Sequence, residues 1–329
     1  MDQLYQQGLE ATRWLQSAWP ALRDVMAFIT ALGEEQAFLV ILPLFYWSID
    51  KRLGRQLGYI FLLSASVNNM AKNILVQPRP FWLDPGVQQF PAEGYGLPSG
   101  HVQNTTAVFL LLASWVRRSW VWLLAFVFIL LMALSRVYLG LHFLQDVAGG
   151  LVIGLLVLAA FLFWQQAFAE RFGRRILGRR LLMMVIIPVA LGVIYLLALV
   201  VRGAPDLNTS WAAYIPPAEL NAHEGTVATI AGLLGFGLGM ILESSRVRFR
   251  ADGPVWKRGA RYLLGIAVAV GIWAGLRAVF PDQPQWLALP LRFVRYLVLL
   301  LWVTYFGPWV FVKLRLAAAD AESEVRITL

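Results

Sequence analysis

Long apolar runs separated by short polar segments recur along almost the whole chain. Crossing a bilayer takes roughly 17–25 mostly apolar residues, and nine segments are candidates for such spans. They lie near residues 25–48, 56–75, 102–116, 119–137, 143–168, 181–201, 225–242, 262–280 and 293–312. The weakest are the first, which contains Glu34 and Glu35, and the eighth, which is short before Arg277. The pattern predicts an all-α protein, a polytopic transmembrane helix bundle of about nine spans.

The two ends of the chain have a different character. Residues 4–20 place apolar side chains at helical spacing among polar ones, so we expect residues 1–24 to form an amphipathic helix on the membrane surface. Its apolar contacts would be Leu4, Leu9, Trp14, Leu15 and Trp19. No basic stretch precedes an apolar core here, so we expect no cleaved signal peptide. Residues 317–329 are polar, and we expect a mobile tail there.

Composition supports a membrane protein and predicts its orientation. Hydrophobic residues make up 59% of the chain and charged residues only 14%, whereas a soluble domain carries about 25% charged residues. The net charge of +9 comes from short basic clusters that follow the odd-numbered spans, a pattern that does not indicate nucleic-acid binding. By the positive-inside rule those loops are cytoplasmic, which places the N-terminus and the segments 77–100, 138–142, 202–224 and 281–292 on the opposite face. The chain contains no cysteine, which excludes disulfides and thiol nucleophiles.

Three short polar motifs fall on that opposite, non-cytoplasmic face. Ionisable residues at membrane depth are energetically costly and by default indicate function. The motifs are, in order, Lys72-Asn-Ile-Leu-Val-Gln-Pro-Arg79-Pro80, Pro98-Ser99-Gly100-His101 and Ser135-Arg136-Val-Tyr-Leu-Gly-Leu-His142-Phe-Leu-Gln-Asp146.

The cations and the small residues of these motifs suit the binding of a phosphate. Lys72, Arg79 and Arg136 can neutralise a dianion, and arginines bind phosphate oxygens bidentately. Ser99 and Gly100 open a predicted helix, whose N-terminal N–H groups form a ready anion site. The motifs therefore predict a phosphate site assembled at one membrane face.

The histidines and the carboxylate suit cleavage of a phosphate ester. His142 and Asp146 are four residues apart and share a helix face if the fifth helix begins by residue 142. Asp146 would then fix the tautomer of His142, as is expected for a histidine nucleophile with an orienting partner. His101 would face the same phosphate as the candidate general acid for the leaving alkoxide.

Together the three motifs resemble those of the type-2 phosphatidic acid phosphatase superfamily. The order Lys-x6-Arg-Pro, Pro-Ser-Gly-His and Ser-Arg-x5-His-x3-Asp is complete, and the resemblance covers about residues 25–200. It implies that His142 attacks phosphorus to form a phosphohistidine, that Asp146 supports it, and that His101 protonates the leaving group. The phosphate ligands that it implies are Lys72, Arg79, Ser99, Gly100 and Arg136. It implies no metal and no cofactor.

The layout of the whole chain resembles the glucose-6-phosphatase and sphingosine-phosphate phosphatase branch of that superfamily. On this basis residues 25–201 would form a phosphatase core of six transmembrane helices, and residues 202–316 would add three more. Phe81, Trp82 and Phe90 are interpreted as membrane-interface anchors. Asn68 is interpreted as an interhelical hydrogen-bonding group, and Gly150 as a small residue for helix packing.

We therefore expect a metal-independent lipid phosphate phosphohydrolase that cleaves a phosphomonoester or diphosphate of a lipid at the outer membrane face. A lipid phosphotransferase that uses the same phosphohistidine is one alternative, and a phosphoester-binding transporter is another. The presence of both histidines with Asp146 favours catalysis over transport. A vanadate-dependent peroxidase is disfavoured, because the peroxidases of the superfamily are soluble.

The expected partners are the lipid substrate and the bilayer, without nucleic acid. A short chain without eukaryotic targeting signals indicates a bacterial inner membrane protein with its active site facing the periplasm. Which phosphorylated lipid is cleaved, and in what oligomeric state, the residues leave open.

Overall fold

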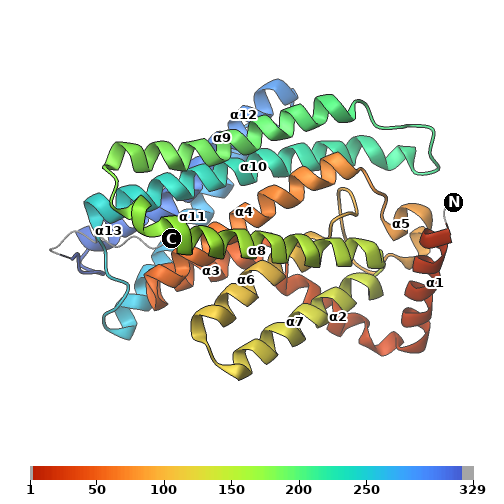
Figure 1. The fold of residues 1–329 in the computed structure, drawn as a ribbon, viewed down its shortest axis with the longest axis horizontal. Coiled ribbons are helices and arrows are strands. Elements are labelled where there is room, and N and C mark those ends of the chain that lie inside the picture. Colours follow the sequence, from red (N-terminus) through yellow and green to blue (C-terminus); the bar gives the residue numbers. More distant parts are fainter. Residues whose placement is uncertain (1–2, 321–329) are drawn as a thin grey trace. The chain divides into compact units, whose positions relative to one another are not determined.

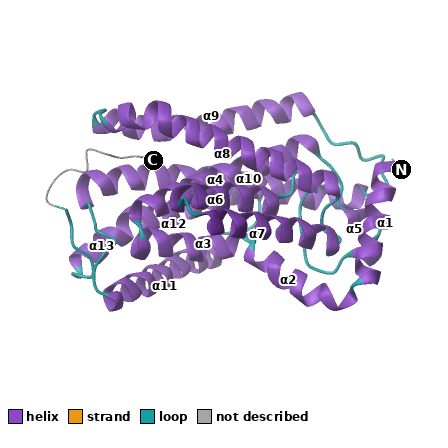
Figure 2. Cartoon of the chain, turned by 60° about the horizontal axis from the view of Figure 1, so that its bottom comes forward, coloured by secondary structure: helices purple, strands orange, loops and turns teal. Residues whose placement is uncertain are grey.

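The computed structural model describes residues 3–320 and consists of helices joined by loops (Figures 1 and 2). Within that range the only β-pairing is one isolated bridge, between Phe249 and Ala319. The predicted all-α fold is confirmed. The helices are α1 (Gln3–Ala18), α2 (Arg23–Leu32), α3 (Glu35–Leu44), α4 (Lys51–Leu75), α5 (Pro80–Leu83), α6 (Gly100–Val116), α7 (Ser119–Tyr138), α8 (Leu144–Gly173), α9 (Leu177–Arg202), α10 (Ile215–Leu242), α11 (Val255–Val279), α12 (Gln285–Leu301) and α13 (Gly307–Lys313).

Among the described residues, six helical segments are long and apolar enough to cross a membrane. They are α7, α8, α9, Ala212–Val247, α11 and Gln285–Lys313, and the bent pair Pro20–Leu32 and Glu35–Ile49 makes a seventh if it counts as one span. In α11 only 11% of the most apolar stretch is buried, which suits a helix surrounded by lipid. The chain is thus an integral membrane protein. α4 carries several charges and α6 has 17 residues, so the count of nine spans stays a prediction.

The chain divides into two compact units. The first comprises Met1–Ala37, Ser64–Leu158 and Tyr195–Thr226, and the second comprises Phe38–Leu63, Ala159–Ile194 and Val227–Leu329. All three sequence motifs belong to the first unit. The proposed boundaries of the interfacial helix, the six-helix core and the additional spans stay predictions.

In the first unit, α1 packs beside the loops that carry the motifs. Leu9 is buried, and the Thr12 hydroxyl donates a 3.2 Å hydrogen bond to the carbonyl of Val137 in α7. Of the other predicted apolar contacts, Leu4 and Trp14 are exposed. A helix is present here over Gln3–Ala18, and Leu9 packs it against the protein. Its place on a membrane surface stays a prediction.

The aromatic residues after the first motif belong to the core of the first unit. Phe81 and Trp82 are each 6% exposed, so their interpretation as membrane-interface anchors is wrong. Trp82 instead stacks on Tyr214, with ring centroids 5.3 Å apart and planes within 7°. Tyr95, also buried, donates a 2.7 Å hydrogen bond to Glu219. The segment Tyr195–Thr226 therefore steadies the loop between the first two motifs.

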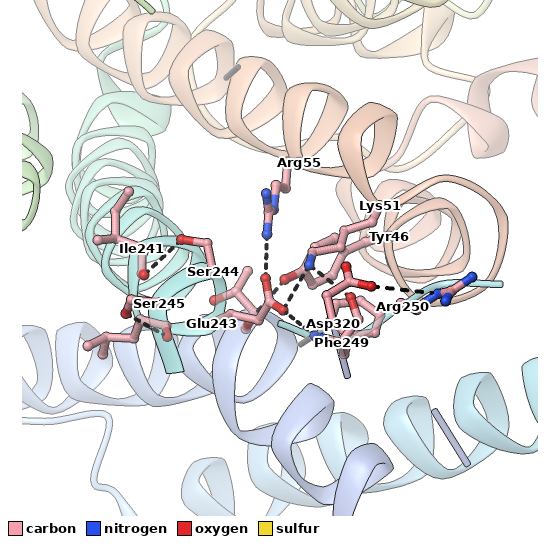
Figure 3. Close-up of polar contacts among 12 residues, drawn as sticks. Tyr46, Lys51, Arg55, Ile241, Glu243, Ser244, Ser245, Phe249, Arg250 and Asp320 are labelled. Atoms are coloured by element: carbon pink, nitrogen blue, oxygen red, sulfur yellow. Dashed lines mark hydrogen bonds and ion pairs between the residues drawn. The ribbon is translucent and has the colours of Figure 1, made fainter. Parts of the chain in front are cut away.

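A buried carboxylate organises one end of the second unit (Figure 3). Glu243, the first residue after α10, is fully buried, and its carboxylate contacts Arg55 and lies 3.0 Å from Lys51 Nζ. The same carboxylate accepts a 2.9 Å hydrogen bond from the Phe249 N–H. Figure 3 shows both cations of α4 pointing toward Glu243. One acidic residue thus joins the start of α4 to the turn that follows α10.

Replacing Glu243 by glutamine is expected to lower the free energy of unfolding by about 3–5 kcal/mol, because it removes the negative charge of a buried ion pair while its cations stay buried. Thermal or denaturant unfolding in detergent measures this change. Glu170→Gln is the matched control, since Glu170 pairs with Arg174 on an exposed surface, where such pairs contribute about 0–1 kcal/mol. Equal, small effects for the two variants would contradict the assignment.

The end of the described chain is held by main-chain hydrogen bonds. Residues 317–329 are expected to form a mobile tail, but Ala318 and Asp320 pair with the segment after α10 through main-chain hydrogen bonds. The Arg250 N–H donates to Ala318 at 2.8 Å, and the Asp320 N–H donates to Arg248 at 2.9 Å. These residues are therefore bonded to the rest of the chain, and residues 321–329 lie outside the part that the structure describes, so the mobile tail stays a prediction.

Candidate active site

The histidine of the third motif lies in the loop between α7 and α8. The helix begins at Leu144 and not by residue 142, so His142 and Asp146 do not share a helix face. They meet nevertheless, with His142 Nδ1 3.3 Å from Asp146 Oδ2. That oxygen also accepts a 2.9 Å hydrogen bond from the Phe143 N–H. The Asp146 carboxylate therefore closes a backbone turn over residues 142–146 and holds the imidazole of His142 beside it.

The guanidinium of Arg79 lies against the other nitrogen of the same ring. Its Nη1 is 3.2 Å from His142 Nε2, and three backbone carbonyls hold it there. Nε donates to Gly94 at 2.6 Å, Nη1 to Leu141 at 2.9 Å and Nη2 to Glu93 at 2.6 Å. Arg79 thereby links the loop that follows the first motif to the third motif.

These contacts assign the protons of the buried imidazole. A guanidinium can only donate, so we assign Nε2 of His142 as the lone-pair nitrogen and Nδ1 as the N–H that faces Asp146. Burial, followed by the positive charges of Arg79, Arg136 and Lys72, lowers the pKa of His142 well below its usual value. The imidazole is therefore neutral, and its Nε2 has the lone pair that a nucleophile needs.

Arg79 remains a cation in this setting. Burial lowers its pKa to about 10, against the opposing effect of the acidic groups Asp146, Glu34 and Glu93. A guanidinium with this pKa is still protonated at neutral pH. The side chain facing Nε2 of His142 is therefore positively charged, as a phosphate ligand requires.

The second motif forms the N-terminus of α6. Ser99 occupies the N-cap position and Gly100 is the first helical residue, so the open N–H groups of a helix start are found here as predicted. The Ser99 N–H donates a 2.9 Å hydrogen bond to the main-chain carbonyl of Asp146. The second and third motifs are thus bound directly to each other.

Close packing fixes this helix start. Asn68 in α4 donates a 3.2 Å hydrogen bond to the carbonyl of Pro98. A Cβ atom at Gly100 would lie 2.8 Å from Asn68 Oδ1, and one at Gly150 would lie 2.5 Å from the carbonyl oxygen of Ser99. Since the atom facing Gly150 belongs to the backbone, that approach requires glycine. The interhelical role of Asn68 and the packing role of Gly150 are confirmed.

Arg136, in the last turn of α7, supplies a further buried cation. Its Nη1 donates a 3.0 Å hydrogen bond to the hydroxyl of Thr30 in α2. Its Nε and the hydroxyl of Ser99 are both buried, and neither is hydrogen-bonded to any residue that the structure describes. Leaving buried polar groups unpaired is costly. Two such donors in one cluster suit the oxygens of a phosphate.

Lys72, in the last turn of α4, completes the predicted set of cations. It interacts electrostatically with Arg79, Arg136 and Asp146, and all three cations act on His142. The residues predicted for the site therefore lie in one cluster within the first unit.

Two residues in this cluster are absent from the sequence-based candidates. One is Thr30, and the other is Glu34, whose Oε1 lies 3.4 Å from His101 Nε2. The carboxylate of Glu34 also interacts electrostatically with Arg136 and Arg79. The sequence did contain a signal for Glu34, because Glu34 and Glu35 interrupt an apolar run. Acidic residues in such a run by themselves suggest function.

Within residues 3–320 no group of three or more histidine, aspartate or glutamate side chains is placed to hold a metal ion. The acidic residues Asp146 and Glu34 each face a histidine instead. The cluster therefore combines donors for an anion with two histidines, each beside a carboxylate.

The chain has clear relatives among known proteins. A profile described as the PAP2 superfamily matches residues 53–172, and one described as the transmembrane extension of PAP2 superfamily phosphatases matches residues 227–319. Sphingosine-1-phosphate phosphatase 2 of Mus musculus is 37% identical over 141 residues, which cover 40% of this chain and 39% of the relative. Glucose-6-phosphatase 3 of Mus musculus is 32% identical over 180 residues, which cover 47% of this chain and 52% of the relative.

One solved structure is also similar. It is the crystal structure of a transmembrane PAP2 type phosphatidylglycerolphosphate phosphatase from Bacillus subtilis, which is 27% identical. The match covers 48% of this chain and 86% of the other, with a TM-score of 0.40. The chain thus spans only 39% and 52% of the two curated relatives, but most of this bacterial enzyme. With a phosphatase domain over residues 53–172 and the transmembrane extension over residues 227–319, this chain belongs to the PAP2 superfamily.

Proposed function

We propose that this chain is an integral membrane phosphatase that hydrolyses a phosphomonoester or diphosphate of a lipid through a phosphohistidine on His142. The observation that carries the proposal is the environment of the imidazole. Its Nδ1 faces Asp146, and its Nε2 lies 3.2 Å from a guanidinium nitrogen of Arg79. A phosphate bound by Arg79 would bring its phosphorus to the lone pair of Nε2.

In the first step, Nε2 of His142 attacks phosphorus in line with the bond to the leaving oxygen. The new N–P bond forms as the P–O bond to the lipid breaks, and the leaving alkoxide takes a proton from His101. The products are the free lipid alcohol and a phosphohistidine. The positive charge that develops on the imidazole is stabilised by Asp146 through Nδ1–H.

In the second step, water attacks the phosphohistidine. His101, now neutral, accepts a proton from the water as the new O–P bond forms and the N–P bond breaks. Inorganic phosphate leaves, and both histidines regain their starting protonation states. No metal or cofactor takes part in either step as we propose them.

Electrostatic stabilisation would supply much of the rate. Lys72, Arg79 and Arg136 surround the phosphoryl group, and the N–H of Gly100 and the hydroxyl of Ser99 complete the cradle. In phosphoryl transfer, charge spreads over the equatorial oxygens, so fixed donors and cations there lower the barrier. The buried, unpaired donors of Arg136 and Ser99 support this assignment.

We further propose that the site opens at the outer face of a nine-span protein in a bacterial inner membrane. The basic clusters that follow the odd-numbered predicted spans support this orientation. The relatives support a lipid phosphate as substrate, since the one of highest identity reported above is named for a phosphorylated sphingoid base. The apolar surface of the spans would hold the lipid chains beside the site.

Phosphate release by detergent-purified protein tests this function. The panel holds phosphatidate, phosphatidylglycerophosphate, a sphingoid-base phosphate, an isoprenyl diphosphate and glucose 6-phosphate. We expect at least one lipid substrate to exceed glucose 6-phosphate in kcat/KM by about tenfold or more, because burial of two CH₂ groups already contributes about that factor. Release should be inhibited by vanadate, which mimics the pentacoordinate phosphorus of the transition state.

The alternatives predict other results. A phosphotransferase would release little phosphate and would instead phosphorylate an alcohol in a mixed acceptor pool. A transporter would carry a radiolabelled phosphoester into proteoliposomes without cleaving it. Release from glucose 6-phosphate alone would refute the lipid specificity and leave the phosphatase assignment intact.

A further inference from the structure

The N-terminal bent helix pair brings side chains to the cluster from outside the matched PAP2 domain, which begins at residue 53. α2 ends at Leu32 and α3 begins at Glu35, so Gly33 and Glu34 form the break between them. Just before the break, Thr30 accepts the hydrogen bond from Arg136. This short segment therefore contacts Arg136, one of the cations of the predicted site.

The backbone at the break lies directly against the imidazole of His101. A Cβ atom at Gly33 would lie 2.8 Å from Cδ2 of His101 and 2.6 Å from Cε of Met132. Real Cβ atoms do not approach other atoms so closely, so a side chain at this position would have to displace the imidazole or the end of Met132. Because position 33 has no side chain, the imidazole of His101 packs directly against the break. The next residue, Glu34, faces Nε2 of that ring.

The carboxylate of Glu34 faces Nε2 of that ring. The separation of 3.4 Å is an ion-pair distance, with the histidine side chain 17% exposed and the glutamate side chain 36% exposed. His101 Nε2 is buried and has no hydrogen bond to any residue between 3 and 320. Glu34 is therefore the acidic group placed to influence the proton on this nitrogen.

The positive charges around His101 make a nearby carboxylate important for its protonation. Arg136 and Lys72 both act on the imidazole, and nearby positive charges disfavour a protonated ring. A general acid must nevertheless carry a proton when the leaving group departs. A carboxylate beside the ring opposes the two cations and favours the protonated form.

We propose that Glu34 is the positioning residue of the general acid. It holds the imidazole of His101 toward the leaving oxygen and favours its protonated form, while His101 itself gives the proton to the alkoxide. This inference rests on the proposed function, and it adds a residue from the segment before the PAP2 domain to the catalytic arrangement.

Leaving-group dependence tests the proposal. Two amphiphilic substrates are compared, a long-chain alkyl phosphate and an aryl phosphate with a comparable chain, whose phenolate leaves without a proton. The measured quantity is kcat/KM, which reports the step in which the leaving group departs. Because general acid catalysis contributes about 10²–10⁴-fold, we expect Glu34→Gln to lower kcat/KM for the alkyl substrate by about 10–100-fold and for the aryl substrate by less than about threefold.

Three further variants make the test decisive. His101→Ala should lower kcat/KM for the alkyl substrate even more, relative to the aryl substrate, than Glu34→Gln does. Glu34→Asp should restore part of the alkyl activity. Glu10→Gln, an exposed change in α1, should match the wild type. If the role of Glu34 were merely structural, Glu34→Gln would lower kcat/KM equally for both substrates, and that result would overturn the inference. An active His142→Ala variant would instead refute the proposed function itself, so the two failures are distinct.

Discussion

Replacing His142 by alanine is expected to lower kcat for every substrate by at least about 10⁴-fold. In an enzyme that forms a covalent intermediate, loss of the nucleophile lowers kcat by roughly 10⁴–10⁶-fold, because substrate binding and electrostatic stabilisation alone supply only a small part of the rate enhancement. His142 is 1% exposed and makes its polar side-chain contacts with Asp146 and Arg79. Phosphate release measures the loss.

The His142→Ala protein should still be folded, because the carbonyls that hold Arg79 and the N–H of Phe143 that binds Asp146 belong to the backbone. Its unfolding temperature and its elution as a single species in detergent check this. A folded variant with wild-type turnover would show that another residue attacks phosphorus.

Replacing Asp146 by asparagine is the second large effect, with an expected fall in kcat of about 10²–10⁴-fold. The amide has nearly the same shape and can still accept the hydrogen bond from Phe143 N–H. Because one carboxylate oxygen, Oδ2, faces both the Phe143 N–H and Nδ1 of His142, the asparagine that keeps its amide oxygen there still accepts from both groups. It lacks only the negative charge that stabilises the cationic imidazole. Exchange of the carboxylate for an amide behind a catalytic histidine has an effect of about 10⁴-fold in a serine protease.

The effect of Asp146→Asn should fall on kcat much more than on KM, because the carboxylate faces the nucleophile and not the phosphate. Asp282→Asn, an exposed change outside the site, serves as control for expression and detergent behaviour. Unchanged kcat in Asp146→Asn would mean that the main-chain contacts of this turn suffice to orient His142.

The sequence predicted much of this arrangement because each motif is local and chemically specific. A helix start follows from Pro98-Ser99-Gly100, and the structure begins α6 at Gly100. The buried cations Arg79 and Arg136 could be predicted because charges inside an apolar chain need partners or a ligand. The order of the motifs and the apolar periodicity then predicted a helical membrane protein with its polar residues gathered together.

What the sequence could not predict depends on contacts between distant segments. Glu34 reaches His101 across 67 positions only because the helix break at Gly33 is folded against that imidazole. Phe81 and Trp82 are of the residue types that anchor proteins at membrane interfaces. The distant segment Tyr195–Thr226, which contains Tyr214, packs against them and buries them. The sequence joined His142 to Asp146 through a helix face on the condition that the helix began by residue 142, whereas a turn closed by the Asp146 side chain holds the two together. Such pairings are set by tertiary packing, which periodicity does not encode.

The phosphohistidine is the central claim, and rapid-quench labelling tests it most directly. The protein is mixed with a ³²P-labelled lipid phosphate, quenched in alkali within the first turnover and digested, and the labelled peptide is sequenced. Our account predicts base-stable, acid-labile label, at most one phosphate per chain, on the peptide that contains His142, and none in His142→Ala. Turnover without any protein-bound label, or label on a different residue, would contradict it.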